Sequence, residues 1–298
     1  MIKNFNELLA KLKDKENKKV VIAAAHGASA IEAGIMAKKE NLADSIFVGD
    51  KEFIQKFLSE KYPDFNHAFE IIDTKSDLKL AAREAVKLIR ENNGDLILKG
   101  KCPTSILLKA VLNKQNGLRT GEILSDVLAY EHPEKLVLMS DGGINLYPDL
   151  KQKISIVRNA VKVAHALENS RPKVALLTAV EVVNEKMQAT IDAALIAKMN
   201  KRNQIKHCVI DGPLAFDNAV SEKAAAAKGI KSEVAGKADI LIVPNIESGN
   251  IFGKALTYYC NYRVAHVVMG AKVPILIASR ADTAETKMLS IALGVLSA

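Results

Sequence analysis

Short apolar runs alternate along the chain with longer segments of helical periodicity. Most runs carry apolar residues at consecutive positions, which is typical of strands that are buried on both faces. The ten runs are Val20–Ala25, Ser45–Val48, Phe69–Ile72, Asp95–Leu98, Lys135–Met139, Lys173–Leu177, His207–Ile210, Asp239–Val243, Val264–Met269 and Pro274–Ala278. Because helices must cover both faces of such strands, the pattern predicts an α/β fold with mainly parallel sheets.

The segments between the runs predict amphipathic helices. Examples are Asp77–Glu91, Asn184–Met199 and Ala215–Lys228. A turn-rich stretch, Asp141–Asp149, follows a predicted strand and precedes a long helical pattern at Leu150–Glu168. Ten strands are many for one sheet, so we expect two α/β domains that meet near this stretch.

Composition agrees with a folded two-domain protein. The chain has 298 residues, of which 49% are hydrophobic and 26% charged. It has no Trp and only 5% aromatic residues, which argues against stacking on single-stranded nucleic acid. The net charge of +8 is spread over helices in which Lys alternates with Glu and Asp. Such spreading argues against nucleic-acid binding and leaves small anions such as phosphates as candidate ligands.

Three cysteines, Cys102, Cys208 and Cys260, are far apart and form no Cys-x-x-Cys pair. We expect free thiols in a reducing compartment and no metal site. The N-terminus lacks the apolar core of a signal peptide, and no apolar run reaches the length of a membrane span. The sequence therefore predicts a soluble, cytoplasmic protein that does not bind membranes.

Common nucleotide and hydrolase motifs are missing. The segment from Gly249 to Lys254 resembles a phosphate loop but is one residue short, and Ala255 replaces the Ser or Thr that binds Mg²⁺. No Gly-x-Gly-x-x-Gly, His-Glu-x-x-His or Gly-x-Ser-x-Gly occurs. His26 follows the first strand, where α/β sheets bind ligands, although a packing or loop role is the simpler interpretation.

Two loops follow strong strands and lead into helical patterns. The first carries Ser248, Gly249 and Asn250, and the second carries Ser279 and Arg280. Loops at the carboxyl ends of strands line ligand crevices, and a helix start favours phosphate. Gly249 would let the backbone approach an anion closely, and Arg280 offers a planar set of donors that matches phosphate oxygens.

Helix capping is the alternative explanation for these polar residues. Ser, Thr, Asp and Asn are common N-caps. Asp282 and Glu285 have the spacing of a capping box, which would explain both acids without chemistry.

A third loop, which contains Lys99, Gly100 and Thr104, also lies between a strand and a helix. Its lysines could bind an anionic substrate, and solvated lysines beside a helix that starts with proline are an equally good interpretation.

The chain resembles the phosphate acetyltransferase and phosphate butyryltransferase family. The resemblance rests on Ser279-Arg280-Ala281-Asp282-Thr283-Ala284-Glu285 together with the upstream Ser248-Gly249-Asn250. It extends over nearly the whole chain, and several segments are more similar to the butyryl branch. The supporting segments are Lys99-Gly100, Asp141–Asp149, Thr178–Ala194, Asp211–Ser221 and Ser279–Ala292.

This resemblance implies two α/β domains with an active site in the cleft between them. The first domain would be residues 1–146, completed by the C-terminal segment 275–298, and the second would be residues 147–274. The implied reaction is reversible transfer of a short acyl group, butyryl before acetyl, between coenzyme A and inorganic phosphate. Coenzyme A and acyl phosphate are then substrates, and no metal or bound cofactor is needed. The family also implies a homo-oligomer.

The resemblance also implies roles for individual residues. Arg280 would bind phosphoryl oxygens, and Ser279 would donate a hydrogen bond to the acyl oxygen or the sulfur. Substrate-binding residues would be Ser248, Gly249, Asn250, Lys99, Gly100 and Thr104.

One position departs from the family pattern. The acetyl branch has a candidate base, an aspartate, seven positions after the serine, and this chain has Thr286 there. Glu285 and Asp282 are the nearest carboxylates, and Glu285 is the candidate base. A reaction that proceeds mainly by stabilisation of the thiolate is the alternative. Three alternatives stay open: a phosphate acetyltransferase, an acyltransferase that uses acyl carrier protein, and a noncatalytic module that binds coenzyme A.

Overall fold

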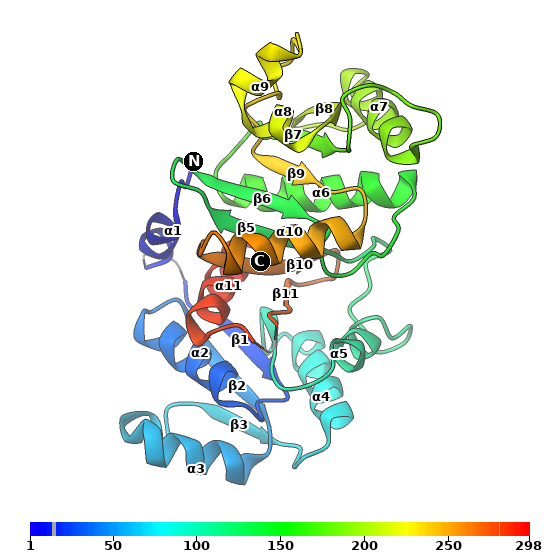
Figure 1. Ribbon diagram of the computed structural model, residues 1–298. Coiled ribbons are helices and arrows are strands. Elements are labelled where there is room, and N and C mark those ends of the chain that lie inside the picture. The colour runs from blue at the N-terminus through cyan, green and yellow to red at the C-terminus, as the bar shows by residue number, and fades with distance from the viewer. Residues whose placement is uncertain (14–15, 280) are drawn as a thin grey trace. The chain divides into compact units, whose positions relative to one another are not determined.

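The computed structural model describes residues 1–13, 16–279 and 281–298 (Figure 1). The chain divides into two compact units. Unit 1 comprises Met1–Asn4 and Ile123–Arg263, and unit 2 comprises Phe5–Glu122 and Val264–Ala298. Both units combine helices with mainly parallel strands, which confirms the predicted α/β class.

Unit 2 is built on strands in the order β3-β2-β1-β4-β11-β10. The strands are β1 (Lys18–Ala23), β2 (Ala43–Gly49), β3 (Glu70–Asp73), β4 (Leu96–Lys99), β10 (Val264–Met269) and β11 (Ile275–Leu276). All these neighbours pair in parallel except β10 and β11. Val21 of β1 lies opposite Ile46 and Ile97, so the centre of this sheet is apolar on both sides, as consecutive apolar positions require.

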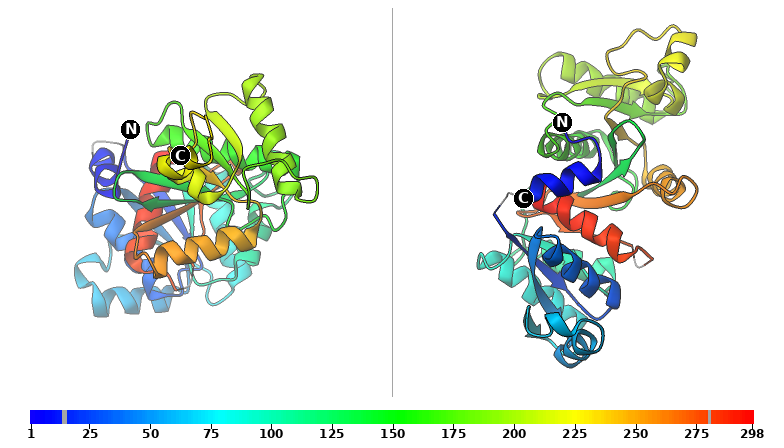
Figure 2. Two further views of the ribbon diagram at one scale, coloured as in Figure 1. Left: turned by 45° about the horizontal axis from the view of Figure 1, so that its top comes forward. Right: turned by 90° about the vertical axis from the view of Figure 1, so that its left-hand side faces the viewer.

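Helices cover both faces of the unit 2 sheet (Figure 2). They are α1 (Phe5–Leu12), α2 (Ala28–Lys39), α3 (Lys51–Lys61), the 3₁₀ turn η1 (Pro63–Phe65), α4 (Leu78–Arg90), α5 (Thr104–Val111) and α11 (Ala284–Ser297). The last helix, α11, packs against α1, α2 and β10, whereas α4 packs against α5 and the other face of β1. Every residue of α11 from Lys287 to Leu296 is buried, so this helix is part of the core.

Unit 1 has strands in the order β5-β6-β9-β7-β8. They are β5 (Ser125–Glu131), β6 (Leu136–Ser140), β7 (Lys173–Leu177), β8 (Val209–Leu214) and β9 (Ile240–Ile242). Only β5 and β6 pair in antiparallel fashion.

The helices of unit 1 also lie on both faces of its strands. They are α6 (Leu150–Ala166), α7 (Gln188–Lys201), α8 (Phe216–Val220), α9 (Glu222–Ala227) and α10 (Ile246–Tyr258). The α6 helix contacts α7, while Phe216 of α8 and Phe252 of α10 pack their rings with centroids 5.0 Å apart.

Each of the ten predicted runs overlaps a strand, and β5 is the strand that the pattern missed. The breaks between the units also differ from the expected ones. They fall after Glu122 and Arg263, not after residues 146 and 274. The reason is that β5 pairs with β6 and β6 with β9, so the turn-rich Asp141–Asp149 segment is a loop within unit 1.

Candidate functional site

The loop after β4 lies against the end of β1. The N–H groups of Gly100 and Lys101 donate to the carbonyl oxygens of Ala23 and Ala24, each at 2.8 Å. A Cβ at Gly100 would come 2.2 Å from the Ala24 carbonyl oxygen, so this approach requires glycine. Thr104 follows as the first residue of α5 and is half-buried.

The two lysines of this loop differ. Lys101 is exposed, whereas Lys99 is only 4% exposed. The Lys99 Nζ donates to the carbonyl oxygens of Gly100 and Cys102, both at 3.3 Å. The alternative of solvated lysines therefore fails for Lys99, because its ammonium lies inside the loop and helps to hold its shape.

The loop after β11 closes on itself at Asp282. The Asp282 carboxylate accepts the N–H of Ser279 at 2.6 Å, and the N–H of Asp282 donates back to the Ser279 carbonyl oxygen at 3.2 Å. Ser279 is exposed at the rim of this turn. The proposed partner of Ser279, Arg280, lies outside the described residues.

The expected capping box between Asp282 and Glu285 is wrong. The N-cap of α11 is Thr283, whose Oγ1 accepts the N–H of Thr286 at 3.1 Å. Asp282 is one residue too early, and its carboxylate caps the turn at Ser279 instead. Glu285 is therefore the second residue of α11 and is exposed, while Thr286 is the third residue, whose N–H the cap accepts. The Thr286 hydroxyl lies 3.1 Å from the Thr283 hydroxyl.

Sequence reasoning missed Lys287. Its side chain is 4% exposed, and its Nζ donates to the carbonyl oxygen of Asp282. Burial lowers the pKa of Lys287, and the charge of Lys99 lowers it further, against the opposing effect of Asp282. Two buried ammonium groups thus hold carbonyl oxygens of the loops after the neighbouring strands β4 and β11. They make the carboxyl ends of these strands electropositive, which favours an anionic ligand.

The candidate segment of unit 1 lies within a helix, not before it. The α10 helix begins at Ile246, and its N-cap Asn245 accepts hydrogen bonds from the N–H (3.0 Å) and hydroxyl (2.6 Å) of Ser248. Gly249 is buried, and a Cβ there would lie 2.7 Å from the Gly142 Cα. Glycine is needed here so that α10 can pack against a neighbouring loop.

That neighbouring loop is organised by Asp141. Its carboxylate accepts the N–H groups of Gly143 (2.9 Å), Ile144 (3.0 Å) and Asn145 (3.1 Å), and the amide Nδ2 of Asn145 (2.6 Å). Burial and the nearby Asp126 carboxylate raise the pKa of Asp141 to about 6.

The loop is tied to the candidate segment through Asn250. This residue is exposed, and its Nδ2 donates to the Gly142 carbonyl oxygen at 3.3 Å. The structure therefore brings the candidate segment next to the Asp141 loop, and sequence reasoning missed Asp141 as the residue that shapes this loop.

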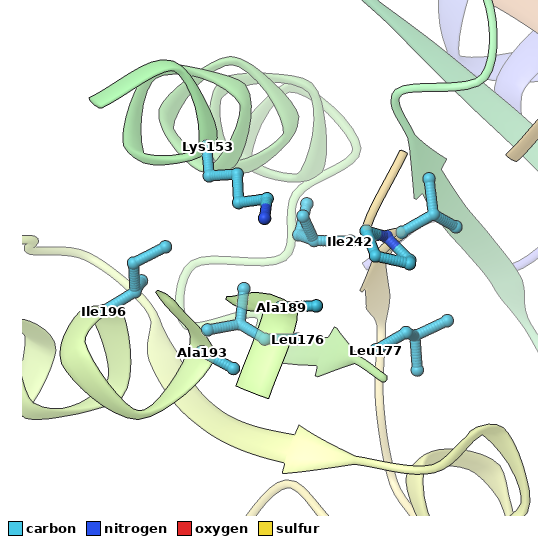
Figure 3. Close-up of a pocket in the computed structure, with 9 residues that line it drawn as sticks. Lys153, Leu176, Leu177, Ala189, Ala193, Ile196 and Ile242 are labelled. Atoms are coloured by element: carbon cyan, nitrogen blue, oxygen red, sulfur yellow. The ribbon is translucent and has the colours of Figure 1, made fainter. Parts of the chain in front are cut away.

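A small cavity in unit 1 lies beside Lys153 (Figure 3). Its volume of about 10 Å³ is close to the space of a single water molecule, so it cannot hold an acyl chain. The Lys153 ammonium is 2.7 Å from the Asp192 carboxylate, which makes this a structural ion pair in an apolar surrounding.

The cysteines are free thiols. Cys102 and Cys208 are buried, and burial raises the pKa of Cys208 to about 11, whereas Cys260 is exposed. Over the described ranges, no group of three or more His, Cys, Asp or Glu side chains is placed to hold a metal ion. None of the described helices combines the length and apolarity needed to cross a membrane.

Comparisons of the sequence and of the structure with known proteins indicate the same family. The profile of the family described as phosphate acetyl/butaryl transferase matches residues 66–295. A phosphate butyryltransferase of Clostridium acetobutylicum is 48% identical over 300 residues, covering 100% of this chain and 99% of the relative. A phosphate acetyltransferase of Thermotoga maritima is 42% identical, covering 97% and 98%. The crystal structure of a branched-chain phosphotransacylase from Enterococcus faecalis V583 superposes with a TM-score of 0.82 at 31% identity, covering 94% and 98%.

Two glycines of α10 provide a matched test of the contact between this helix and the Asp141 loop. Gly249→Ala should lower the free energy of unfolding by about 1–3 kcal/mol, because its Cβ meets backbone atoms that cannot move aside. Gly253→Ala should be tolerated, since its Cβ meets only the side-chain ends of Leu128 and Met139, at 3.3 and 3.4 Å. Urea unfolding of both variants measures the difference, and equal stability of the two would contradict the close contact at Gly142.

Proposed function

Because the chain belongs to the phosphate acetyl/butaryl transferase family, we propose that it transfers a butyryl group, or an acyl group of similar length, reversibly between coenzyme A and inorganic phosphate. The observation that carries the proposal is the 48% identity to a phosphate butyryltransferase over the full length of both chains. The electropositive ends of β4 and β11 support it, since every substrate of this reaction is an anion.

The proposed reaction is a direct displacement. The thiolate of coenzyme A attacks the carbonyl carbon of the acyl phosphate, a carbon–sulfur bond forms, and the carbon–oxygen bond to phosphate breaks. In the other direction phosphate attacks the thioester and the thiolate leaves. This mechanism uses no thiol of the enzyme. Holding both substrates in line supplies much of the acceleration in reactions of this type.

The roles proposed for Ser279 and Arg280 follow from the family resemblance, and those of Lys99 and Lys287 from their burial and charge. Arg280 binds the phosphoryl oxygens and offsets charge in the transition state. Ser279, exposed at the rim of its turn, donates a hydrogen bond to the acyl oxygen or to the sulfur. Lys99 and Lys287 do not contact the substrates in this proposal. Their ammonium groups hold the two loops in place and add positive potential to the site.

The substrate-binding roles of the remaining residues are part of the same proposal. Gly100 and Thr104 shape the loop after β4, and Ser248, Gly249 and Asn250 shape the start of α10. We propose that the exposed Asn250 also contributes to binding phosphate. The cleft between two domains and the homo-oligomer that the family resemblance implies stay predictions.

Three other functions are distinguishable from this one. A phosphate acetyltransferase is favoured by the 42% identity to the Thermotoga maritima enzyme, and it would prefer acetyl-CoA. An acyltransferase that uses acyl carrier protein would need that protein in place of coenzyme A. A noncatalytic module would bind coenzyme A without turnover.

An assay with acyl-CoA substrates from two to six carbons tests the proposed function. We expect phosphate-dependent release of coenzyme A, fastest with butyryl-CoA and unchanged by EDTA. A preference for acetyl-CoA selects the acetyltransferase. Turnover only with acyl carrier protein, or no turnover with any of these substrates, contradicts the proposal.

Replacing Arg280 tests the proposed phosphoryl contact. Arg280→Ala should lower kcat by about 100-fold or more, the scale of losing one transition-state donor. Arg280→Lys should retain only part of the wild-type kcat, because an ammonium cannot make the two parallel hydrogen bonds of a guanidinium. The matched control is Arg171→Ala, which removes an exposed arginine of unit 1 that pairs with Glu233. Normal turnover of Arg280→Ala with a lower Tm would show a structural role instead.

Glu285→Gln tests the proposed proton acceptor. We expect at least tenfold lower turnover at pH 7, and a smaller deficit toward pH 9, where a thiol with a pKa of about 8.5 ionises without help. Because the N-cap of α11 is Thr283, a capping box does not explain Glu285, and a favourable interaction with the helix dipole is one structural alternative. Glu7→Gln, in the first turn of α1, controls for that effect. Equal and pH-independent turnover of Glu285→Gln and wild type would exclude Glu285 as the base.

A further inference from the structure

The order of strands in unit 2 reverses beside β1. The chain runs from β1 to β2 and β3 in one direction, and β4 then pairs with the other edge of β1 (Figure 1). The loops after β1 and β4 therefore lead to helices on opposite faces of the sheet. In open α/β sheets such a reversal leaves a crevice at the carboxyl ends of the strands, where ligands bind.

A hollow of about 340 Å³ lies at these strand ends. Its volume falls within the usual range for sites that bind small molecules. Six residues from the loops after β1, β2, β3 and β4 and from the helices that follow line it. They are His26, Asp50, Phe53, Ser76, Leu78 and Lys101.

The hollow has an internal frame of hydrogen bonds. Asp50, directly after β2, accepts the N–H of Phe53 at 3.0 Å on one carboxylate oxygen and the hydroxyl of Ser76 at 3.2 Å on the other. The His26 ring lies against Gly49, and its Nε2 is 3.1 Å from the carbonyl oxygen of Lys75. These bonds join the loops after β1, β2 and β3, so the hollow is formed before any ligand arrives.

The lining matches the parts of a nucleotide. The Phe53 ring is 40% exposed and offers a face on which a base can stack. Asp50 is a carboxylate at the end of the second strand, the position from which α/β folds bind ribose hydroxyls, and each of its oxygens can accept a second hydrogen bond. Lys101 is exposed, the methylene groups of its side chain lie beside Gly27, and its ammonium suits a phosphate.

The distance between the hollow and Ser279 sets a minimum length for a ligand that reaches both. In the sheet, β11 is the second neighbour of β1, which corresponds to about 10 Å at the usual strand spacing. A ligand whose nucleotide lies in the hollow must therefore have a long arm, which extends past the end of β4, if its reactive group is to reach Ser279. We propose that this hollow binds the adenosine bisphosphate end of coenzyme A, and that the pantetheine arm crosses the β4 loop to Ser279. This inference rests on the proposed function.

A truncated substrate isolates the contribution of the hollow. Phe53→Ala and Lys101→Ala should each raise KM for butyryl-CoA by about tenfold, with little change in kcat. Neither should change KM for butyryl-pantetheine, which lacks the nucleotide. Lys109→Ala, which removes an exposed lysine of α5 outside the hollow, is the matched control and should behave as wild type with both substrates. Equal increases in KM for both substrates, or no increase with butyryl-CoA, would overturn the proposal.

Direct binding separates this inference from the proposed function. Adenosine 3′,5′-bisphosphate, titrated by calorimetry, should bind the wild-type protein and bind Phe53→Ala and Lys101→Ala at least tenfold more weakly. If the wild-type protein binds the bisphosphate in this way but turns over no acyl-CoA, the proposed function fails and the nucleotide site stands. If the wild-type protein does not bind it, or the variants bind it equally well, the nucleotide site is refuted even in an active enzyme.

Discussion

The burial of α11 is the constraint on which the candidate site depends. Its residues from Lys287 to Leu296 are all buried, against α1, α2 and β10. At Gly294 the helix comes so close to the sheet that a Cβ would lie 2.7 Å from Leu276 and 2.8 Å from Leu96. Because a packed helix of this kind cannot slide, its first turn has a fixed position, and so does its N-cap Thr283.

The same burial explains how a charged side chain becomes part of the site. Lys287 begins the buried stretch of α11, and its ammonium is retained there by the Asp282 carbonyl oxygen. Removing an ammonium from water costs free energy, which the adjacent Lys99 increases, and the lowered pKa of Lys287 reflects this cost. A phosphate or acyl phosphate near the two lysines would offset it, so the unbound site has a built-in attraction for anionic substrates.

Much of the fold could be predicted because parallel strands have a strong pattern. Consecutive apolar residues marked ten strands correctly, whereas β5 was missed because it begins with the polar residues Ser125 and Asp126. Both are buried by contacts distant in the sequence, such as the hydrogen bond from Asn159 Nδ2 to Ser125 Oγ at 2.8 Å. The start of α10 was placed too late because Gly249 resembles a loop residue, although its role is to pack against Gly142.

The candidate site was less predictable, since its chemistry depends on which polar groups are buried. Ser279 and Gly100 were proposed as site residues from their place after a strand. The sequence could not show that Lys99 and Lys287 turn inward, or that Thr283 in place of Asp282 caps α11. A lysine at the start of an otherwise apolar helix is the signal that could have identified Lys287.

The central claim is that the acyl group passes directly between coenzyme A and phosphate. Incubating the protein with butyryl phosphate and isotopically labelled inorganic phosphate tests this most directly. The account predicts that label enters butyryl phosphate only when coenzyme A is present, because the thioester must form before phosphate can attack it. Label that enters without coenzyme A would contradict direct transfer, because it requires an acyl group held on the protein.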